Sequence, residues 1–242
     1  MIVGLLHPGA MGAALGDALL AGGHEVLWAS AARSGETRGR AAGFRDVETV
    51  AELAAASDVL LSVCPPHAAV EVAAETEGFD GLYVDANAVS PDSAREVAAL
   101  HPRFVDGGIV GPPPREAGTT RLYLSGAEAP AVAALFEGSM VGTRLVADAS
   151  ALKMTYAAWS KGTAALLLAI RDVARANGVW DDLQAEWRDS APDLPARLEA
   201  AERSAAAKGW RWIGEMEEIA DTFAAAGAPE GFHRAAAEVY RS

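Results

Sequence analysis

A glycine-containing turn near the N-terminus has the residue types that hold the pyrophosphate of a dinucleotide. It comprises His7, Pro8, Gly9, Ala10, Met11 and Gly12. The turn lies between an apolar run, Ile2–Leu6, and an alanine-rich stretch over residues 10–21, which is the strand, turn and helix order of a Rossmann site. Gly9 lets the backbone approach the phosphates, Gly12 lets the helix pack on the strand, and the helix N-terminus offers unpaired amides. Because His7 replaces the first glycine of the fingerprint, a turn with a structural role alone is the alternative.

The segment after the second apolar run, Glu25–Trp28, indicates which nicotinamide cofactor binds. An NAD-selective site places an acidic residue about 20 residues past the glycines, against the ribose 2′-hydroxyl. No carboxylate follows this run until Glu36, whereas Ser30, Arg33 and Ser34 can donate hydrogen bonds to a 2′-phosphate. The sequence therefore predicts NADPH, and not NADH, as the cofactor. A solvated loop with a surface arginine is the alternative.

The elements that must position these residues alternate along the first part of the chain. Up to about residue 147, short apolar runs alternate with amphipathic stretches, which predicts an α/β domain with a doubly wound sheet of parallel strands. The expected strands are Ile2–Leu6, Glu25–Trp28, Val59–Val63, Leu82–Asp85, Arg103–Asp106, Arg121–Leu124 and Arg144–Val146. The expected helices are Ala10–Ala21, Glu48–Ala56, Ala68–Glu75 and Asp92–Leu100. We expect residues 1–147 to form a Rossmann-type dinucleotide-binding domain.

The rest of the chain, residues 148–242, is alanine-rich with apolar positions at the helical period, which predicts a smaller all-α domain. A mostly apolar stripe follows its first long helix and comprises Leu152, Tyr156, Trp159, Thr163, Leu166, Ile170 and Val173. Asn177 and Gly178 predict the end of that helix, and Pro192 and Pro195 predict a break before a further pair of helices. One small domain can hardly cover so wide a stripe, so we expect a homodimer, with this domain serving substrate binding and dimerisation.

The composition excludes several partners. A formal net charge of -13 repels nucleic acid, because nucleic-acid binding depends on Lys and Arg that neutralise phosphates. Cys64 is the single cysteine, and no cysteine and histidine cluster has the spacing of a zinc site, so we expect a cytoplasmic protein without a metal. The N-terminal apolar run lacks a basic flank and is typical of a buried strand. The stretch Ala164–Ile170 is far shorter than the roughly 20 residues that a bilayer requires, so we expect no membrane partner.

With the glycine turn in place, the order of segments over essentially the full length resembles the β-hydroxyacid dehydrogenase superfamily. This superfamily includes 3-hydroxyisobutyrate and 6-phosphogluconate dehydrogenases and imine reductases. Cys64 and Pro65 are similar to the turn on the cofactor side of the family, and Asp85–Pro91 is similar to its Asp-x-Ser-Thr-x-x-Pro motif. Asn87 stands where that serine usually does. The resemblance implies that Cys64, Pro65 and Asn87 contact the cofactor.

The resemblance also implies where a substrate and a proton donor lie. Asp106–Pro112 is similar to the substrate loop of the family, which assigns substrate binding to Ile109, Val110 and Gly111, with Val110 in place of a serine. The catalytic lysine of the family corresponds to Lys153, whose ammonium would give a proton to a carbonyl oxygen as hydride arrives. A solvent-facing helix lysine is the alternative.

The partners of Lys153 differ from those of the family. The asparagine that usually follows the lysine by four residues is Ala157 here. Tyr156 and Ser160, one and two turns past Lys153, are the polar groups that remain as catalytic candidates on that helix. Tyr156 also belongs to the apolar stripe, so a core tyrosine is equally compatible. Lys161 is displaced from this row, and we expect it at the surface.

Two segments, Ser150–Met154 and Trp212–Glu218, are most similar to a branch with a phosphogluconate-dehydrogenase-like C-terminal domain, in which few activities are assigned. Trp210, two residues before the second segment, is a candidate for substrate binding, although tryptophans at such positions more often pack. Glu215, inside the segment, is a second candidate, because the resemblance implies a Lys-Asp pair of the family there. We expect an NADPH-dependent oxidoreductase that transfers hydride to or from a small carbonyl or β-hydroxy acid substrate. An imine reductase and a non-catalytic dinucleotide-binding protein are the alternatives.

Overall fold

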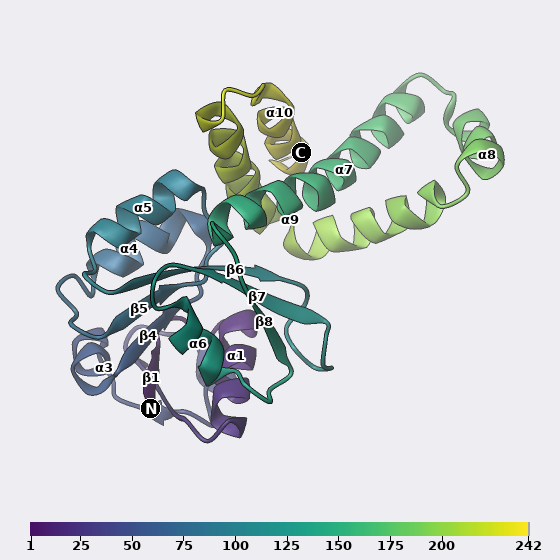
Figure 1. Ribbon diagram of the computed structural model, residues 1–242. Helices are drawn as coiled ribbons and strands as arrows, with labels where there is room; N and C mark the ends of the chain where they lie inside the picture. Colours follow the sequence, from purple (N-terminus) through teal and green to yellow (C-terminus); the bar gives the residue numbers. More distant parts are fainter. Residues whose placement is uncertain (242) are drawn as a thin grey trace. The chain divides into compact units, whose positions relative to one another are not determined.

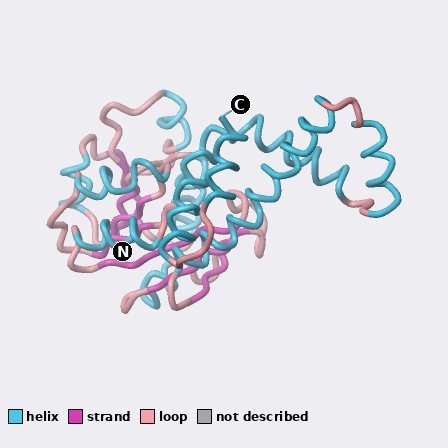
Figure 2. Tube along the Cα trace, turned by 90° about the horizontal axis from the view of Figure 1, so that it is seen from above, coloured by secondary structure: helices cyan, strands magenta, loops and turns pink. Residues whose placement is uncertain are grey.

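The computed structural model describes residues 1–241 and separates into two compact units, Met1–Lys153 and a unit that begins at Met154. A long helix, α7 (Ala149–Ala176), starts in the first unit and continues into the second (Figure 1). The domain boundary expected between residues 147 and 148 lies just before this helix. Figure 2 distinguishes the strands, in magenta, from the helices, in cyan.

The first unit is built on one eight-stranded sheet with the order β3-β2-β1-β4-β5-β6-β7-β8. The strands are β1 (Ile2–Leu5), β2 (Glu25–Trp28), β3 (Arg45–Asp46), β4 (Val59–Ser62), β5 (Leu82–Asp85), β6 (Phe104–Val110), β7 (Thr120–Ser125) and β8 (Val141–Leu145). The chain winds outward from β1 to β3 and then outward from β4 in the opposite direction, which is the doubly wound Rossmann arrangement. The predicted α/β fold class is confirmed.

The sheet differs from the sequence expectation in four places. β3 has only two residues, both exposed, so no apolar run marks it. β6 continues to Val110, past the expected end at Asp106. The sequence pattern missed this extension because Gly107 and Gly108 interrupt the apolar run, although they remain in the strand. β7 pairs with β6 in antiparallel fashion, since no helical crossover separates these two strands. β8 begins at Val141, where the sequence pattern placed its start at Arg144.

Helices cover both faces of this sheet. One face packs on α1 (Ala10–Ala21) and α6 (Ala129–Leu135). The other packs on α3 (Val50–Ala56), α4 (Ala69–Ala74) and α5 (Pro91–Ala99). The short helix α2 (Gly35–Arg40) and the 3-10 turn η1 (Pro66–Ala68) complete the unit.

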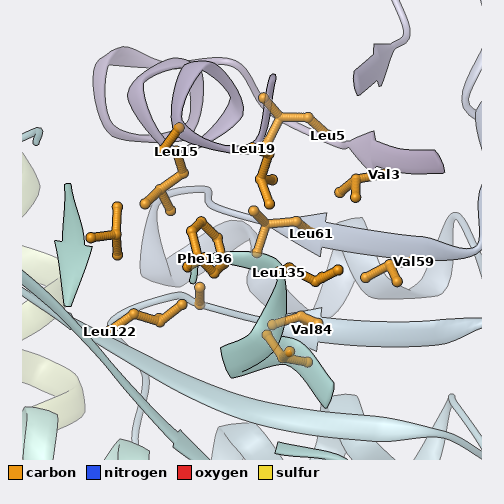
Figure 3. Close-up of a cluster of buried hydrophobic side chains, with 14 of the residues drawn as sticks. Val3, Leu5, Leu15, Leu19, Val59, Leu61, Val84, Leu122, Leu135 and Phe136 are labelled. Atoms are coloured by element: carbon orange, nitrogen blue, oxygen red, sulfur yellow. The ribbon is translucent and has the colours of Figure 1, made fainter. Parts of the chain in front are cut away.

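The central strands read as continuous apolar runs because both of their faces are buried. Successive residues of β4 show this division, since Leu60 belongs to the core under α3, α4 and α5, and Leu61 to the core under α1 and α6. In Figure 3, Leu15 and Leu19 of α1 face Leu61 and Leu135. Packing in this core therefore holds α1 against the sheet, so that the turn between β1 and α1 stays at the carboxyl end of β1.

The second unit is wholly helical within its described part. After α7 follow α8 (Trp180–Ser190), α9 (Leu194–Ala225) and α10 (Gly231–Arg241). Gly178 has a φ of 70°, the left-handed conformation that ends a helix, as the sequence predicts. The predicted break before α9 falls at residues 191–193, which include Pro192, whereas Pro195 lies inside the first turn of α9, a position that tolerates proline. α9 and α10 pack on each other, with Trp212 against Tyr240 and Phe223 against His233, and Met216 and Ile219 of α9 are fully buried. Residues 1–241 contain no helix long and apolar enough to cross a membrane, and no group of three potential metal ligands.

Candidate functional site

The sheet reverses its winding direction between β1 and β4, which are neighbours with β2 on the far side of β1. In open α/β sheets, ligands bind outside the carboxyl ends of the strands at such a switch point. The glycine turn leaves this edge after β1, the loop with Arg33 leaves it after β2, and the turn with Cys64 leaves it after β4. The predicted cofactor residues of three separate segments are thus brought to one edge.

The glycine turn has open space on one side and close packing on the other. A Cβ placed on Gly9 would meet no atom within 4 Å, whereas one placed on Gly12 would lie 2.3 Å from the carbonyl oxygen of His7. Gly9 is the N-cap of α1, and no side chain of the described residues caps the helix there. The amides of the first turn of α1 are therefore available to an anion. Of the other turn residues, Pro8 is buried, Ala10 is exposed and Met11 packs on the core.

Arg33 reaches from the loop after β2 back to the glycine turn. Its Nη1 donates to Nε2 of His7 at 2.8 Å, and its Nη2 lies 3.5 Å from the carbonyl oxygen of Leu6. Because a guanidinium can only donate, His7 accepts through Nε2, and its neutral ring carries the proton on Nδ1. Burial, and next the charge of Arg33, lowers the pKa of His7 from 6.5 to about 4. His7 is therefore a neutral acceptor at pH 7.

Two donors of this pair have no acceptor. Nδ1 of His7 and Nε of Arg33 are buried and lack a hydrogen-bond partner among residues 1–241. Buried donors are almost always satisfied in folded proteins, so an unsatisfied pair indicates the place of an acceptor that belongs to a ligand or to solvent. Together with the open side of Gly9, these donors fit a dinucleotide phosphate.

The two serines predicted beside Arg33 make bonds within the protein. Ser34 is the N-cap of α2, where its Oγ accepts from a backbone amide at 3.2 Å. Ser30 is buried, and a hydrogen bond between its side chain and Asp46 contributes most to the lowered pKa of that carboxyl. The carbonyl oxygen of Ser30 also accepts from Arg38 at 2.8 Å. These bonds hold the loop from which Arg33 extends.

A cavity of about 640 Å³ lies beside this loop and was not predicted from the sequence. It is lined by Ser30, Ala31, Arg38, Asp46, Val47, Glu48 and Glu52. Its volume is within the range of small-molecule sites, and its three carboxylates accept hydrogen bonds from hydroxyl and amino groups. The cavity thus suits an uncharged ring or sugar better than a phosphate.

Asn87 connects the carboxyl ends of β4 and β5. Its Oδ1 accepts from the amide of Cys64 at 2.5 Å, and its Nδ2 donates to Ser62 at 3.0 Å and to Asp85. Burial raises the pKa of the Cys64 thiol to about 12, so this cysteine is an unreactive structural residue. The side chain of Asn87 is therefore used within the protein, where it fixes the Cys64–Pro65 turn at the same edge as the glycine turn.

Lys153 lies at the carboxyl end of β6. Its Nζ donates to the carbonyl oxygen of Ile109 at 2.7 Å. The start of α7 packs directly on β6 at Gly108, where a Cβ would lie 2.8 Å from the carbonyl oxygen of Ala149 and 2.9 Å from Cβ of Lys153. The lysine is partly buried against the strand, so the alternative of a fully solvent-facing side chain does not describe it.

Asp106 of β6 anchors the start of α7, a role that sequence reasoning missed. Its carboxylate accepts from the amide of Ser150 at 2.8 Å, from the hydroxyl of Ser150 at 2.6 Å and from Ser125 at 3.0 Å. Ser125 in turn accepts from the amide of Ala149 at 2.9 Å. A negative charge is favourable at a helix N-terminus. The sequence signal is a carboxylate inside an apolar strand, together with a serine three residues before Lys153.

The predicted substrate loop offers backbone groups at this edge. The side chains of Ile109 and Val110 are buried in the protein interior. Gly111 has a φ of 118°, and a Cβ there would lie 2.1 Å from the carbonyl oxygen of Thr119, so only glycine fits. The polar group that a serine would present at position 110 is absent from this chain.

The remaining candidates belong to the second unit. Tyr156 and Ser160 are exposed on α7, and Trp210 is exposed on α9. Glu215 is buried and forms an ion pair with Lys161 at 2.5 Å. The expectation that Lys161 lies at the surface is wrong, because 13% of its side chain is exposed and its charge is paired inside the helical unit. Glu215 is accordingly engaged within the protein.

Comparison with known proteins matches residues 174–242 to a family described as "Domain of unknown function (DUF1932)". An uncharacterized 28.5 kDa protein of Methanothermus fervidus is 30% identical over 148 residues. That match covers 58% of this chain and 57% of the relative.

Solved structures match over nearly the whole chain. A conserved protein of unknown function, described as structurally similar to 3-hydroxyacid dehydrogenases, is 25% identical with a TM-score of 0.72, over 100% of this chain and 97% of that one. A 3-hydroxyisobutyrate dehydrogenase of Salmonella typhimurium is 17% identical with a TM-score of 0.74, over 100% and 93%. A reductive aminase of Aspergillus terreus, in complex with NADPH and ethyl levulinate, is 17% identical with a TM-score of 0.61, over 99% and 92%. The resemblance drawn from the motifs is confirmed at the level of the fold.

Proposed function

We propose that this chain, which has the fold of the 3-hydroxyacid dehydrogenases and carries a DUF1932 segment, is an NAD(P)-dependent oxidoreductase that uses NADPH. The observation that carries the proposal is the pairing of Arg33 with His7 beside a glycine turn whose Gly9 side is open. The names of the structural neighbours support it, since they include dehydrogenases and a reductive aminase solved with NADPH.

The residues of the carboxyl edge divide the work of cofactor binding. The amides of the glycine turn and of the first turn of α1 hold the pyrophosphate. Arg33 holds the 2′-phosphate, because a guanidinium binds phosphate oxygens through paired hydrogen bonds. The Cys64–Pro65 turn, fixed by Asn87, closes the side toward β4. When bound at this edge, the nicotinamide dinucleotide supplies or accepts hydride.

Lys153 holds the proton that the substrate oxygen gains or loses. Its Nζ is oriented by the carbonyl of Ile109, and its helix is fixed to β6 by Asp106 and Gly108. In the direction of reduction, its ammonium donates a proton to a carbonyl oxygen, and in the reverse direction its amine takes the proton of a β-hydroxy group. The substrate class we propose is a small carbonyl compound or β-hydroxy acid.

Imine reduction is a second candidate, and it is favoured by two apolar positions. Val110 and Ala157 are buried. Val110 stands where the superfamily that this chain resembles has its substrate-binding serine, and Ala157 where that superfamily has the asparagine that assists the lysine. A site without these polar groups suits a substrate that lacks a hydroxy acid group. Lys153 argues for the carbonyl reaction, because an imine needs little proton donation.

Replacing Lys153 tests its role. We expect Lys153→Ala to lower kcat by about 100-fold to 10,000-fold, the usual contribution of a general acid or base, with an unchanged Kd for NADPH. Lys208→Ala, which removes an exposed lysine of α9, serves as the matched control and should keep full activity. Steady-state rates over carbonyl and imine panels, with NADPH fluorescence for Kd, provide the measurement. Equal turnover in both variants would show that Lys153 is not the proton donor.

A further inference from the structure

We propose that His7 is a positioning residue that holds Arg33 against the glycine turn and thereby lets the site distinguish NADPH from NADH. The inference rests on the proposed cofactor and goes beyond it, because it assigns selectivity to the residue that departs from the glycine fingerprint. The fingerprint alone predicts the opposite, namely that any side chain at position 7 weakens dinucleotide binding.

The contact between the two side chains joins two parts of the site. Arg33 extends from the loop after β2, where the 2′ position of the ribose lies in Rossmann folds. Its Nη1 is fixed by Nε2 of His7 at 2.8 Å, while the Leu6 carbonyl at 3.5 Å is a weaker second acceptor. Without the ring of His7, Arg33 would keep only that weaker contact to the turn.

The charges near the same loop explain why such an anchor is needed. Asp46, Glu48 and Glu52 line the neighbouring cavity, and a released guanidinium would be attracted toward these carboxylates. His7 offers a neutral acceptor instead, so this contact does not neutralise the positive charge of Arg33. A bound phosphate could interact with that charge and accept hydrogen bonds from Nδ1 of His7 and Nε of Arg33, which lack a partner among residues 1–241.

The test compares the affinities of two cofactors across four variants of the full chain. His7→Gly restores the glycine of the fingerprint, His7→Gln keeps a side-chain acceptor, and Arg33→Gln removes the guanidinium. The fourth variant combines His7→Gly with Arg33→Gln. Kd is measured for NADPH and NADH by nicotinamide fluorescence, and the affinity for NADH together with the thermal unfolding midpoint reports whether each variant is folded.

We expect His7→Gly to lower the preference for NADPH over NADH by about tenfold, the effect of one hydrogen bond to a charged group. His7→Gln should retain most of the preference. Arg33→Gln should lose it, and the double variant should be no worse than Arg33→Gln, because both changes remove one interaction.

Four outcomes would overturn the inference. An unchanged or improved preference in His7→Gly would show that position 7 acts only as the glycine fingerprint predicts. Additive losses in the double variant would show that His7 does not act through Arg33. If the wild-type protein binds both cofactors equally, the proposed dinucleotide site stands but the proposed selectivity does not. If it binds neither cofactor, the proposed function is overturned as well.

Discussion

Among single residues, three histidines are kept neutral at pH 7 by their surroundings in the folded protein. Burial lowers the pKa of His7, His101 and His233, and for His7 the charge of Arg33 adds to the effect. When the pKa of a histidine is lower in the folded protein than in the unfolded chain, the unfolded chain binds a proton first as the pH falls. The free energy of unfolding therefore falls with the pH in that range. These residues therefore couple the stability of the protein to mild acid.

For His7 the pH window can be stated. Its pKa is 6.5 in the unfolded chain and about 4 in the folded protein, so the unfolded chain binds the extra proton between these values. The stability that neutral His7 contributes is complete above pH 6.5 and is lost as the pH falls toward 4. We expect His7→Gln to flatten this fall by about 1–2 kcal/mol after allowance for solvent screening. Urea unfolding at pH 7.0 and 5.0 measures it, and parallel pH profiles would contradict it.

Which residues could be predicted from the sequence depends on whether their role is local. Gly9 and Gly12 follow from the spacing of a turn, and Arg33 from its distance to that turn. The contact of Arg33 with His7, and the ion pair of Lys161 with Glu215, join positions far apart in the chain. No period or motif encodes such contacts, because they depend on how the loops and helices pack.

Among the helices, α7 is fixed by packing at its start and carries exposed apolar residues farther along. Its start is fixed by Asp106 and by the close packing at Gly108. Farther along, four residues of the predicted apolar stripe are exposed, namely Tyr156, Leu166, Trp159 at 61% and Val173 at 63% of their accessible surface. Exposed apolar area of this kind usually marks an interface. We propose that a second copy of the chain covers it.

A change in α7 tests this dimer. We expect the wild-type protein to be a dimer by light scattering at micromolar concentration, because pairing the stripe with the same stripe of a second copy would bury its exposed apolar residues. Placing two charges in the stripe, with Leu166→Asp and Val173→Asp together, should give a folded monomer. Arg175→Asp, an exposed change on the same helix outside the stripe, is the control. A monomeric wild-type protein would remove the proposed interface.

At the scale of the whole molecule, the alternation of apolar runs and amphipathic stretches was sufficient to predict the fold class. Buried parallel strands appear in the sequence as short apolar runs, and crossover helices appear as amphipathic stretches between them. The two-residue strand β3 and the antiparallel pairing of β6 with β7 left no such pattern, because they depend on edges and short connections. Neither affects the edge at which the site lies.

A cofactor titration is the most direct test of whether the first unit binds NADPH at the carboxyl edge of its sheet. Purified protein is titrated with NADPH and with NADH, and nicotinamide fluorescence and tryptophan quenching are followed. We expect micromolar binding of NADPH and a higher Kd for NADH, because Arg33 and the donors that lack a partner among residues 1–241 lie beside the glycine turn, where they can bind a phosphate. Failure of both cofactors to bind would contradict it, and would leave the glycine turn with a structural role alone.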